Sequence, residues 1–236
     1  MASRKGYLVL GIALLISFFV VLVLLFLPIF PDGDNGLNFS DRMFNSISKG
    51  SSYVIPKLMD QNEAFRGGMV DTSIEMKTSE DAAVAAQLFT AAGAVAEAQG
   101  KELKVSGDLG KMLEAVLNDS DSMFYNEGEK VAGRYGIDAK KVMENWWQAL
   151  DLMDKKFRNK KMIAQAKFVS EVNKKAVETS YNFYGIVPEK VNEKFGIMTG
   201  LLVFYILYTM WYGFAIFYIF EGLGFNITMP KKKKEV

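Results

Sequence analysis

Two long apolar runs without a charged residue bracket this chain of 236 residues. The first run extends from Gly6 to Phe30 and the second from Gly196 to Phe220, and each is 25 residues long. In a helix, about 20 apolar residues are enough to cross the roughly 30 Å hydrocarbon core of a bilayer. We therefore predict two transmembrane helices, with the lipid bilayer as the first partner of the chain.

The two runs divide the chain into five expected segments. We expect a cytoplasmic N-terminal tail at residues 1–5, a first transmembrane helix at 6–30, an extracytoplasmic domain at 31–195, a second transmembrane helix at 196–220 and a polybasic cytoplasmic tail at 221–236. An uncleaved anchor is favoured over a signal peptide for the first run, because signal peptides have an apolar core of only about 7–15 residues.

Basic residues near the two runs predict the orientation. Lys and Arg close to a transmembrane segment are retained in the cytoplasm. Acidic side chains follow the first run, at Asp32, Asp34 and Asp41, whereas basic side chains lie before the first run and after the second. The expected topology anchors, which put both termini inside, are Arg4, Lys5, Lys231, Lys232, Lys233 and Lys234.

Composition excludes many kinds of chemistry. The sequence has no Cys and no His, so disulfides, thiolate or imidazole metal ligands and His- or Cys-dependent nucleophilic triads are absent. The expected extracytoplasmic domain has 22 basic and 25 acidic residues, and this balance gives no reason to expect a nucleic acid partner. We expect no enzyme activity, no cofactor and no metal site.

Regular apolar spacing within the central segment is helical. Apolar residues recur every three or four positions from Met143 to Phe157, behind Asp138 as a helix N-cap. Further helices are expected at about 80–99, 109–117 and 162–184, with a loop at Asn118, Asp119 and Asp121, and strand signals are few. The predicted fold class is all-α, an extracytoplasmic helical bundle between two transmembrane helices.

Two sets of residues suggest contacts with partners. Trp146 and Trp147 are neighbours about 100° apart on their helix, so one of them can reach the surface as a possible partner surface, and otherwise both belong to a wide apolar face. Small residues and Tyr hydroxyls in the apolar runs predict packing on the other span, on a second copy or on another membrane subunit. These membrane-helix packing residues are Gly196, Gly200, Tyr205, Tyr208, Tyr212, Ala13 and Ser17.

A short stretch resembles the cell-wall glucosaminidases related to flagellar muramidases. It comprises Ile163-Ala164-Gln165-Ala166 and the later Tyr181-Asn182-Phe183-Tyr184-Gly185-Ile186. The family has a catalytic Glu followed by Ser-Gly-Trp, whereas this sequence has Val169-Ser170-Glu171-Val172 at that place. The resemblance therefore implies, at most, a degenerate glycosidase-like domain that lacks the proton donor.

The sequence favours a non-enzymatic accessory or scaffold subunit of a bacterial inner-membrane assembly that presents a helical periplasmic domain. A periplasmic sensor or ligand-binding module acting through a partner is the alternative. An endoplasmic-reticulum membrane is the alternative location, because Lys233 and Lys234 match a dilysine signal in a eukaryote.

Overall fold

A computed structural model of the chain describes residues 4–225, and most of these residues are helical. They form two compact units. Residues up to Phe44 and from Lys190 belong to the terminal unit, and Asn45–Glu189 form the central unit. The polybasic segment with Lys231, Lys232, Lys233 and Lys234 lies outside the described residues.

The terminal unit contains two helices that are long and apolar enough to cross a membrane, α1 (Arg4–Phe26) and α10 (Val191–Leu223). Between them are a short 3-10 turn (Pro31–Gly33) and the first part of α2 (Gly36–Ser51). Helix α1 ends four residues before Phe30 because a proline at position 28 disfavours helical backbone in the residue before it. Helix α10 begins at Val191, so it is longer than the apolar run from Gly196 to Phe220.

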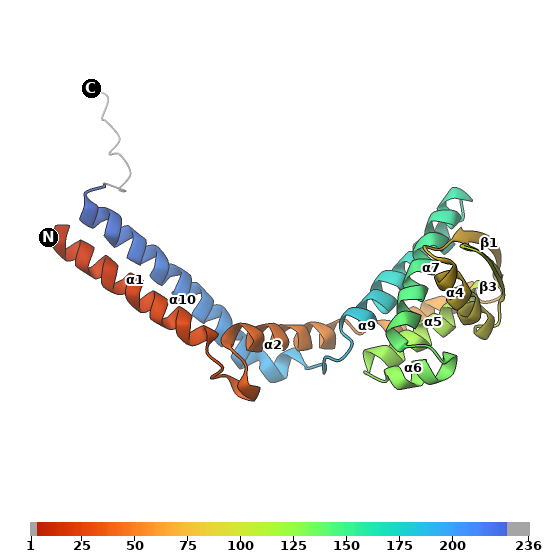
Figure 1. Cartoon of the computed structure of the whole chain (residues 1–236), viewed down its shortest axis with the longest axis horizontal. Coiled ribbons are helices and arrows are strands. Elements are labelled where there is room, and N and C mark those ends of the chain that lie inside the picture. Colours follow the sequence, from red (N-terminus) through yellow and green to blue (C-terminus); the bar gives the residue numbers. More distant parts are fainter. Residues whose placement is uncertain (1–3, 226–236) are drawn as a thin grey trace, which may run out of the picture. The chain divides into compact units, whose positions relative to one another are not determined.

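Helices α1 and α10 lie side by side and antiparallel (Figure 1). Gly11 and Gly222 allow the two backbones to approach closely, since a methyl group added at either glycine would come within 2.6 Å of the opposite helix. Further along the pair, the ring of Tyr208 stacks on Phe18 with centroids 4.2 Å apart. On α1, Leu8, Gly11, Leu14 and Phe18 are three or four positions apart, as expected for one stripe of a helix. We call this contact the α1/α10 seam; its main residues are Tyr7, Leu8, Gly11, Leu14, Phe18, Tyr208, Trp211, Ala215, Tyr218, Ile219 and Gly222.

The central unit combines helices with a small sheet. In chain order its elements are α3 (Ile55–Asn62), a 3-10 turn (Glu63–Phe65), β1 (Met69–Glu75), α4 (Ser79–Ala91), β2 (Val95–Gln99), β3 (Glu102–Asp108), α5 (Leu109–Phe124), α6 (Gly128–Tyr135), α7 (Ala139–Asn159), α8 (Ile163–Val172), a π-helical turn (Asn173–Val177) and α9 (Glu178–Asn182).

The expectation of an all-α fold is wrong in one respect, because the central unit contains a three-stranded antiparallel sheet in the order β1-β3-β2. Alternate residues of β1 and β3 are buried, with Ile74 paired to Leu103 and Thr72 paired to Val105. This buried face packs against α4 and α7, and the other face is exposed. Alternation of period two was present in the sequence but covers only seven residues in each strand.

Two expected local structures also differ. The Ala-rich helix expected to reach position 99 ends at Ala91, because Gly93 adopts a left-handed conformation with φ +82° and the chain turns into β2. The loop expected at Asn118, Asp119 and Asp121 is instead helical, within α5. Asp119 remains in the helix because its carboxylate is buried and hydrogen-bonded to side chains of other helices rather than to nearby backbone.

Helix α7 forms as the sequence predicts. The Asp138 carboxylate accepts hydrogen bonds from the backbone N–H groups of Lys140 and Lys141, at 3.0 and 3.2 Å, which caps the helix. The expected helix at 162–184 is interrupted by the π-helical turn, and it ends before Gly185, which has a positive φ.

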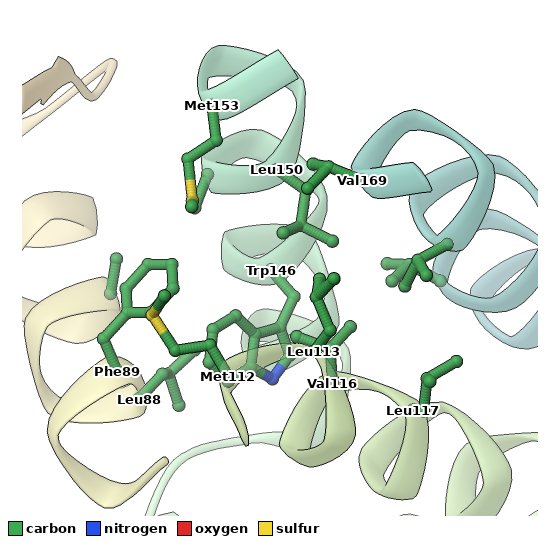
Figure 2. Close-up of a cluster of buried hydrophobic side chains, with 14 of the residues drawn as sticks. Leu88, Phe89, Met112, Leu113, Val116, Leu117, Trp146, Leu150, Met153 and Val169 are labelled. Carbon is green, nitrogen blue, oxygen red and sulfur yellow. The ribbon is translucent and has the colours of Figure 1, made fainter. Parts of the chain in front are cut away.

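The core of the central unit lies between α4, α5, α7, α8 and the buried face of the sheet. Trp146 is at its centre, with the Phe89 ring 5.0 Å away in an edge-to-face arrangement. Figure 2 shows the indole of α7 among side chains from α4 and α5. Completely or almost completely buried residues of this cluster include Leu88, Phe89, Met112, Leu113, Val116, Leu117, Trp146, Leu150, Met153 and Val169.

Candidate functional site

The packing residues expected in the second apolar run fall into two groups. Tyr208 is on the α1/α10 seam, where its hydroxyl donates a hydrogen bond to the backbone oxygen of Phe18 at 3.0 Å. Tyr212 lies beside the same phenylalanine, with ring centroids 5.1 Å apart. Gly196 and Gly200 have no described atom within 4 Å of an added methyl group, and Tyr205 is 68% exposed. This second group is not used in the contact between α1 and α10.

The small residues expected in the first run are not the ones that meet α10. Ala13 is exposed, and the Ser17 hydroxyl donates to the backbone oxygen of Leu14 within its own helix, at 2.9 Å. Gly11 has the role that sequence reasoning gave to this pair. Trp211, which was not among the predicted residues, donates its indole N–H to the Leu14 oxygen at 3.1 Å.

Two of the expected topology anchors, Arg4 and Lys5, are located at the start of α1. Arg4 and Lys5 are both exposed, and the Arg4 guanidinium lies near Gly224, immediately after α10. At the opposite end of α1, Asp32 and Asp34 form ion pairs with Arg42 at 3.0 and 2.7 Å. The helix pair therefore has Arg4 and Lys5 at one end, whereas the connection at the other end carries Asp32 and Asp34 paired with Arg42.

The two neighbouring tryptophans have different environments. Trp146 is fully buried, so it belongs to the core and is not part of a partner surface. Trp147 is half-buried, and its indole N–H donates to Glu178 Oε1 at 2.7 Å. Only Trp147 remains a candidate for contact with a ligand or partner.

Trp147 borders an open groove of about 370 Å³ on the central unit. Helix α7 provides one wall, and the end of the π-helical turn together with α9 provides the other. Asn173, the first residue of the π turn, donates from its side-chain amide to the Trp147 backbone oxygen at 3.1 Å, which connects the two walls. We call this cavity the Trp147 groove; it is lined by Met143, Glu144, Trp147, Val177, Glu178, Tyr181 and Asn182.

A second open groove, of about 400 Å³, is also lined by Trp147. Its lining is mostly charged and of both signs, including Glu75, Lys101, Asp151 and Lys155. The Lys77 ammonium lies 5.7 Å from the centre of the Trp147 ring. Because the Lys77 ammonium already faces the indole here, this groove is less suited than the first to a cationic ligand.

A buried carboxylate connects α5, α6 and α7. Asp119 accepts hydrogen bonds from the Tyr135 hydroxyl at 2.7 Å and from the Trp146 indole N–H at 2.8 Å, and it also pairs with Arg134. Burial raises the pKa of the Asp119 carboxyl, while its donors and the Arg134 charge oppose this shift. Tyr135 and Trp146 are buried and Arg134 is at the surface, so the network ties the core to the edge of α6 and is structural.

A fully buried lysine forms a second internal polar cluster. The Lys49 ammonium donates to the backbone oxygens of Phe183 and Ile186, at 3.0 and 2.6 Å, and to Asn126 Oδ1 at 3.0 Å. Burial lowers the pKa of Lys49. Its three N–H donors are therefore used to hold the segment after α9 against the end of α2.

The residues that resemble a glucosaminidase motif do not form an acid site. Val169, at the position of the catalytic Glu in that family, is fully buried in the core. Glu171, two residues later, pairs with Lys175 on the same helical surface at 2.7 Å. Within residues 4–225, no group of three or more acidic side chains is arranged to hold a metal ion.

Comparisons with family models, with curated proteins and with solved structures found no match for this chain.

Proposed function

We propose that this chain is a two-span membrane protein that acts as a non-enzymatic accessory or scaffold subunit of an inner-membrane assembly. In this proposal, α1 and α10 cross the bilayer, both chain ends are cytoplasmic and the central unit is on the periplasmic side. Lipid surrounds the helix pair, and the protein partners are other membrane subunits or a second copy of the chain.

The observation that carries this proposal is the α1/α10 seam. The polar groups of Tyr208 and Trp211 bond to backbone oxygens of α1, so the seam satisfies them without water. The surfaces away from the seam are apolar and exposed, as at Val9, Ile16 and Leu207, which are at least 60% exposed. Such a large apolar surface suits a bilayer and is unfavourable in water.

The proposed orientation is supported by charge and by the antiparallel pairing. Arg4 and Lys5 are at the end of the helix pair where α1 begins and α10 ends, and Asp32 and Asp34 follow α1 at the other end. Basic residues are retained on the cytoplasmic side. Both chain ends are therefore proposed to be cytoplasmic.

A scaffold role is favoured over catalysis by the use of the buried ionisable groups. Asp119 and Lys49 are the buried side chains most able to serve as an acid or a base, and both are engaged by structural partners inside the central unit. The sequence also lacks Cys and His. These observations favour a central unit that presents a surface to partners over one that catalyses a reaction.

Single-cysteine labelling tests the topology cleanly because the natural chain contains no cysteine. Glu97→Cys places a thiol on exposed strand β2, and Val236→Cys places one at the last residue. In intact cells with a permeable outer membrane, an impermeant maleimide should label position 97 and not position 236. Labelling of position 236 alone would reverse the orientation. If neither position is labelled in intact cells and both are labelled after cell lysis, the periplasmic placement is wrong.

Native mass spectrometry after gentle membrane extraction tests the scaffold role. The chain should be recovered with other membrane subunits or with a second copy in a fixed ratio. Recovery as a monomer under conditions that keep a known inner-membrane complex intact would contradict the proposal.

A ligand-binding module is the second candidate function, and the Trp147 groove favours it. The groove has the size of a small-molecule site and combines apolar walls with a few polar groups. This role is compatible with membrane anchoring, and it is tested by direct binding rather than by the assembly state.

A further inference from the structure

The Trp147 groove has an unbalanced charge. Two of its lining side chains are carboxylates, Glu144 and Glu178, and none is Lys or Arg. Glu144 is exposed, and Lys141, the cation nearest to it among the ion pairs of the described residues, is 3.9 Å away. Glu178 is bonded to the Trp147 indole N–H, which leaves its negative charge without an ion-pair partner in the described part of the chain. An anion entering the groove would be repelled and a cation attracted.

Aromatic and apolar groups accompany these carboxylates. Trp147 and Tyr181 provide two partly exposed rings in the same groove, and the fully buried Met143 and Val177 lie behind them. The negative face of an aromatic ring attracts an organic cation, with tryptophan the most effective ring. Because the Trp147 N–H is held by Glu178, the indole is fixed in position before a ligand arrives.

The π-helical turn explains how the carboxylate comes to this place. The turn Asn173–Val177 widens the helix immediately before Glu178, and single π turns of this kind are frequent at functional sites. Its first residue, Asn173, is tied to the Trp147 backbone. The local departure from regular helix therefore lies at the wall of the groove.

We propose that the Trp147 groove binds a small organic cation, an ammonium group carried on an apolar body. The ammonium would lie between the carboxylates and the Trp147 ring, and the apolar body would contact the exposed ring of Tyr181. The inference specifies the ligand class of the ligand-binding module, and it rests on that second candidate function rather than on the scaffold role.

The test uses the full chain in a non-ionic detergent without a choline headgroup, since choline would itself compete. Tryptophan is replaced biosynthetically by 5-fluorotryptophan, and Trp147→Phe and Trp211→Phe assign the three fluorine signals. The probe is benzyltrimethylammonium chloride. Its matched controls are benzyl alcohol, which is neutral, and benzoate, which is anionic. The signal of Trp146 reports whether the core remains folded.

Benzyltrimethylammonium should shift the Trp147 signal saturably at millimolar concentrations and leave the Trp146 signal in place, while benzoate should have no effect. Glu178→Gln keeps an oxygen for the indole N–H but removes the charge, and we expect about tenfold weaker binding. Glu144→Gln should also weaken binding several-fold. Glu129→Gln, an exposed change on α6, should bind the probe as the parent does.

The outcomes distinguish the preference for a cation from the ligand-binding function of the groove. If benzyl alcohol shifts the Trp147 signal as strongly as the cation, or if both glutamine variants bind the cation as the parent does, the groove binds ligands but the inferred cation preference is wrong. If none of the three probes shifts the Trp147 signal while the parent is folded, both the cation inference and the ligand-binding function fail.

Discussion

Gly11 of α1 lies against the backbone nitrogen of Ile219 in α10, so close that a methyl group at Gly11 would be 2.6 Å from that atom. Only a residue without a side chain allows this approach, and small residues have the same role in many membrane helix pairs. The contact fixes which stripe of each helix faces the other. It therefore gives a direct way to test the helix pair.

Gly11→Leu should separate α1 from α10. Overpacking costs about 1–3 kcal/mol, which corresponds to a shift of about 5- to 150-fold in the equilibrium between the packed and separated pair. Nitroxide labels on Val9→Cys and Phe217→Cys, both exposed, would report this as a longer and broader distance distribution in double electron–electron resonance. Gly213→Leu is the matched control because nothing described lies within 4 Å of an added methyl group there. Equal distributions for both leucine variants would contradict the seam.

Gly196 and Gly200, which have free space around them on α10, lead to a prediction about partners. Gly196→Leu combined with Gly200→Leu should leave the α1/α10 distance unchanged, since neither glycine is used in the seam. If the scaffold proposal is right and this surface contacts a second helix, the double variant should lose copurifying chains or show a smaller apparent size in detergent. Gly213→Leu again controls for added bulk. Unaltered copurification would mean that the partners bind elsewhere.

The buried carboxylate of Asp119 should be important for the stability of the central unit. Asp119→Leu removes the acceptor for Tyr135 and Trp146 and leaves Arg134 without its partner, which should cost about 3–5 kcal/mol in the free energy of unfolding. Asp119→Asn should cost less, about 1–2 kcal/mol, because an oxygen remains. Near-ultraviolet circular dichroism during denaturation measures both values. Asp151→Asn, on the exposed side of α7, should change stability by less than about 0.5 kcal/mol.

The stability of the central unit is expected to depend on pH through the ionisation of Asp81. The hydrogen bond from Lys141 Nζ, at 2.7 Å, lowers the pKa of the Asp81 carboxyl below its ordinary value of 3.8. A lowered pKa in the folded state means that the ionised carboxyl stabilises the fold above pH 3.8, and that this contribution is lost as the pH falls through the folded-state value. The stability difference between the parent and Asp81→Asn should therefore be largest near neutral pH and shrink in acid. A difference that grows in acid would contradict this assignment.

Lys49 should control the local stability of the segment after α9. Lys49→Met keeps the length of the side chain but leaves the oxygens of Phe183 and Ile186 without their donor. Amide hydrogen exchange in residues 183–189 should become at least about tenfold faster, as expected when an interaction of about 1.4 kcal/mol or more is lost. Lys57→Met, an exposed change on α3, should have no such effect. Unchanged exchange in the Lys49 variant would show that the segment is held by other contacts.

Only part of this fold could be predicted from the sequence. The apolar runs and the N-cap at Asp138 were predictable because each depends on neighbouring residues. The strands were missed because Val70, Thr72 and Ile74 form too short an alternation to stand out beside an Ala-rich helix. Asp119 was expected in a loop because its three partners are 15 or more residues away in the sequence.

The same limit applies to the candidate site. Trp147 was identified as one of a pair, but only the fold shows that Trp146 is the buried member. Glu178 could not be connected with Trp147 from the sequence, because the π-helical turn changes which residues of that segment share a face. Likewise, Gly196 and Gly200 match a known spacing, whereas Gly11 and Gly222, which are on different helices, match none.

The contacts of Gly11 and Gly222 also restrict how the helix pair can move. Sliding α1 along α10 by one helical turn, about 5.4 Å, would bring a larger side chain to each point where a glycine now allows close backbone contact. The two helices are therefore built to resist sliding past each other. Any displacement of one helix along the bilayer normal would carry the other with it, so the pair would move as a unit.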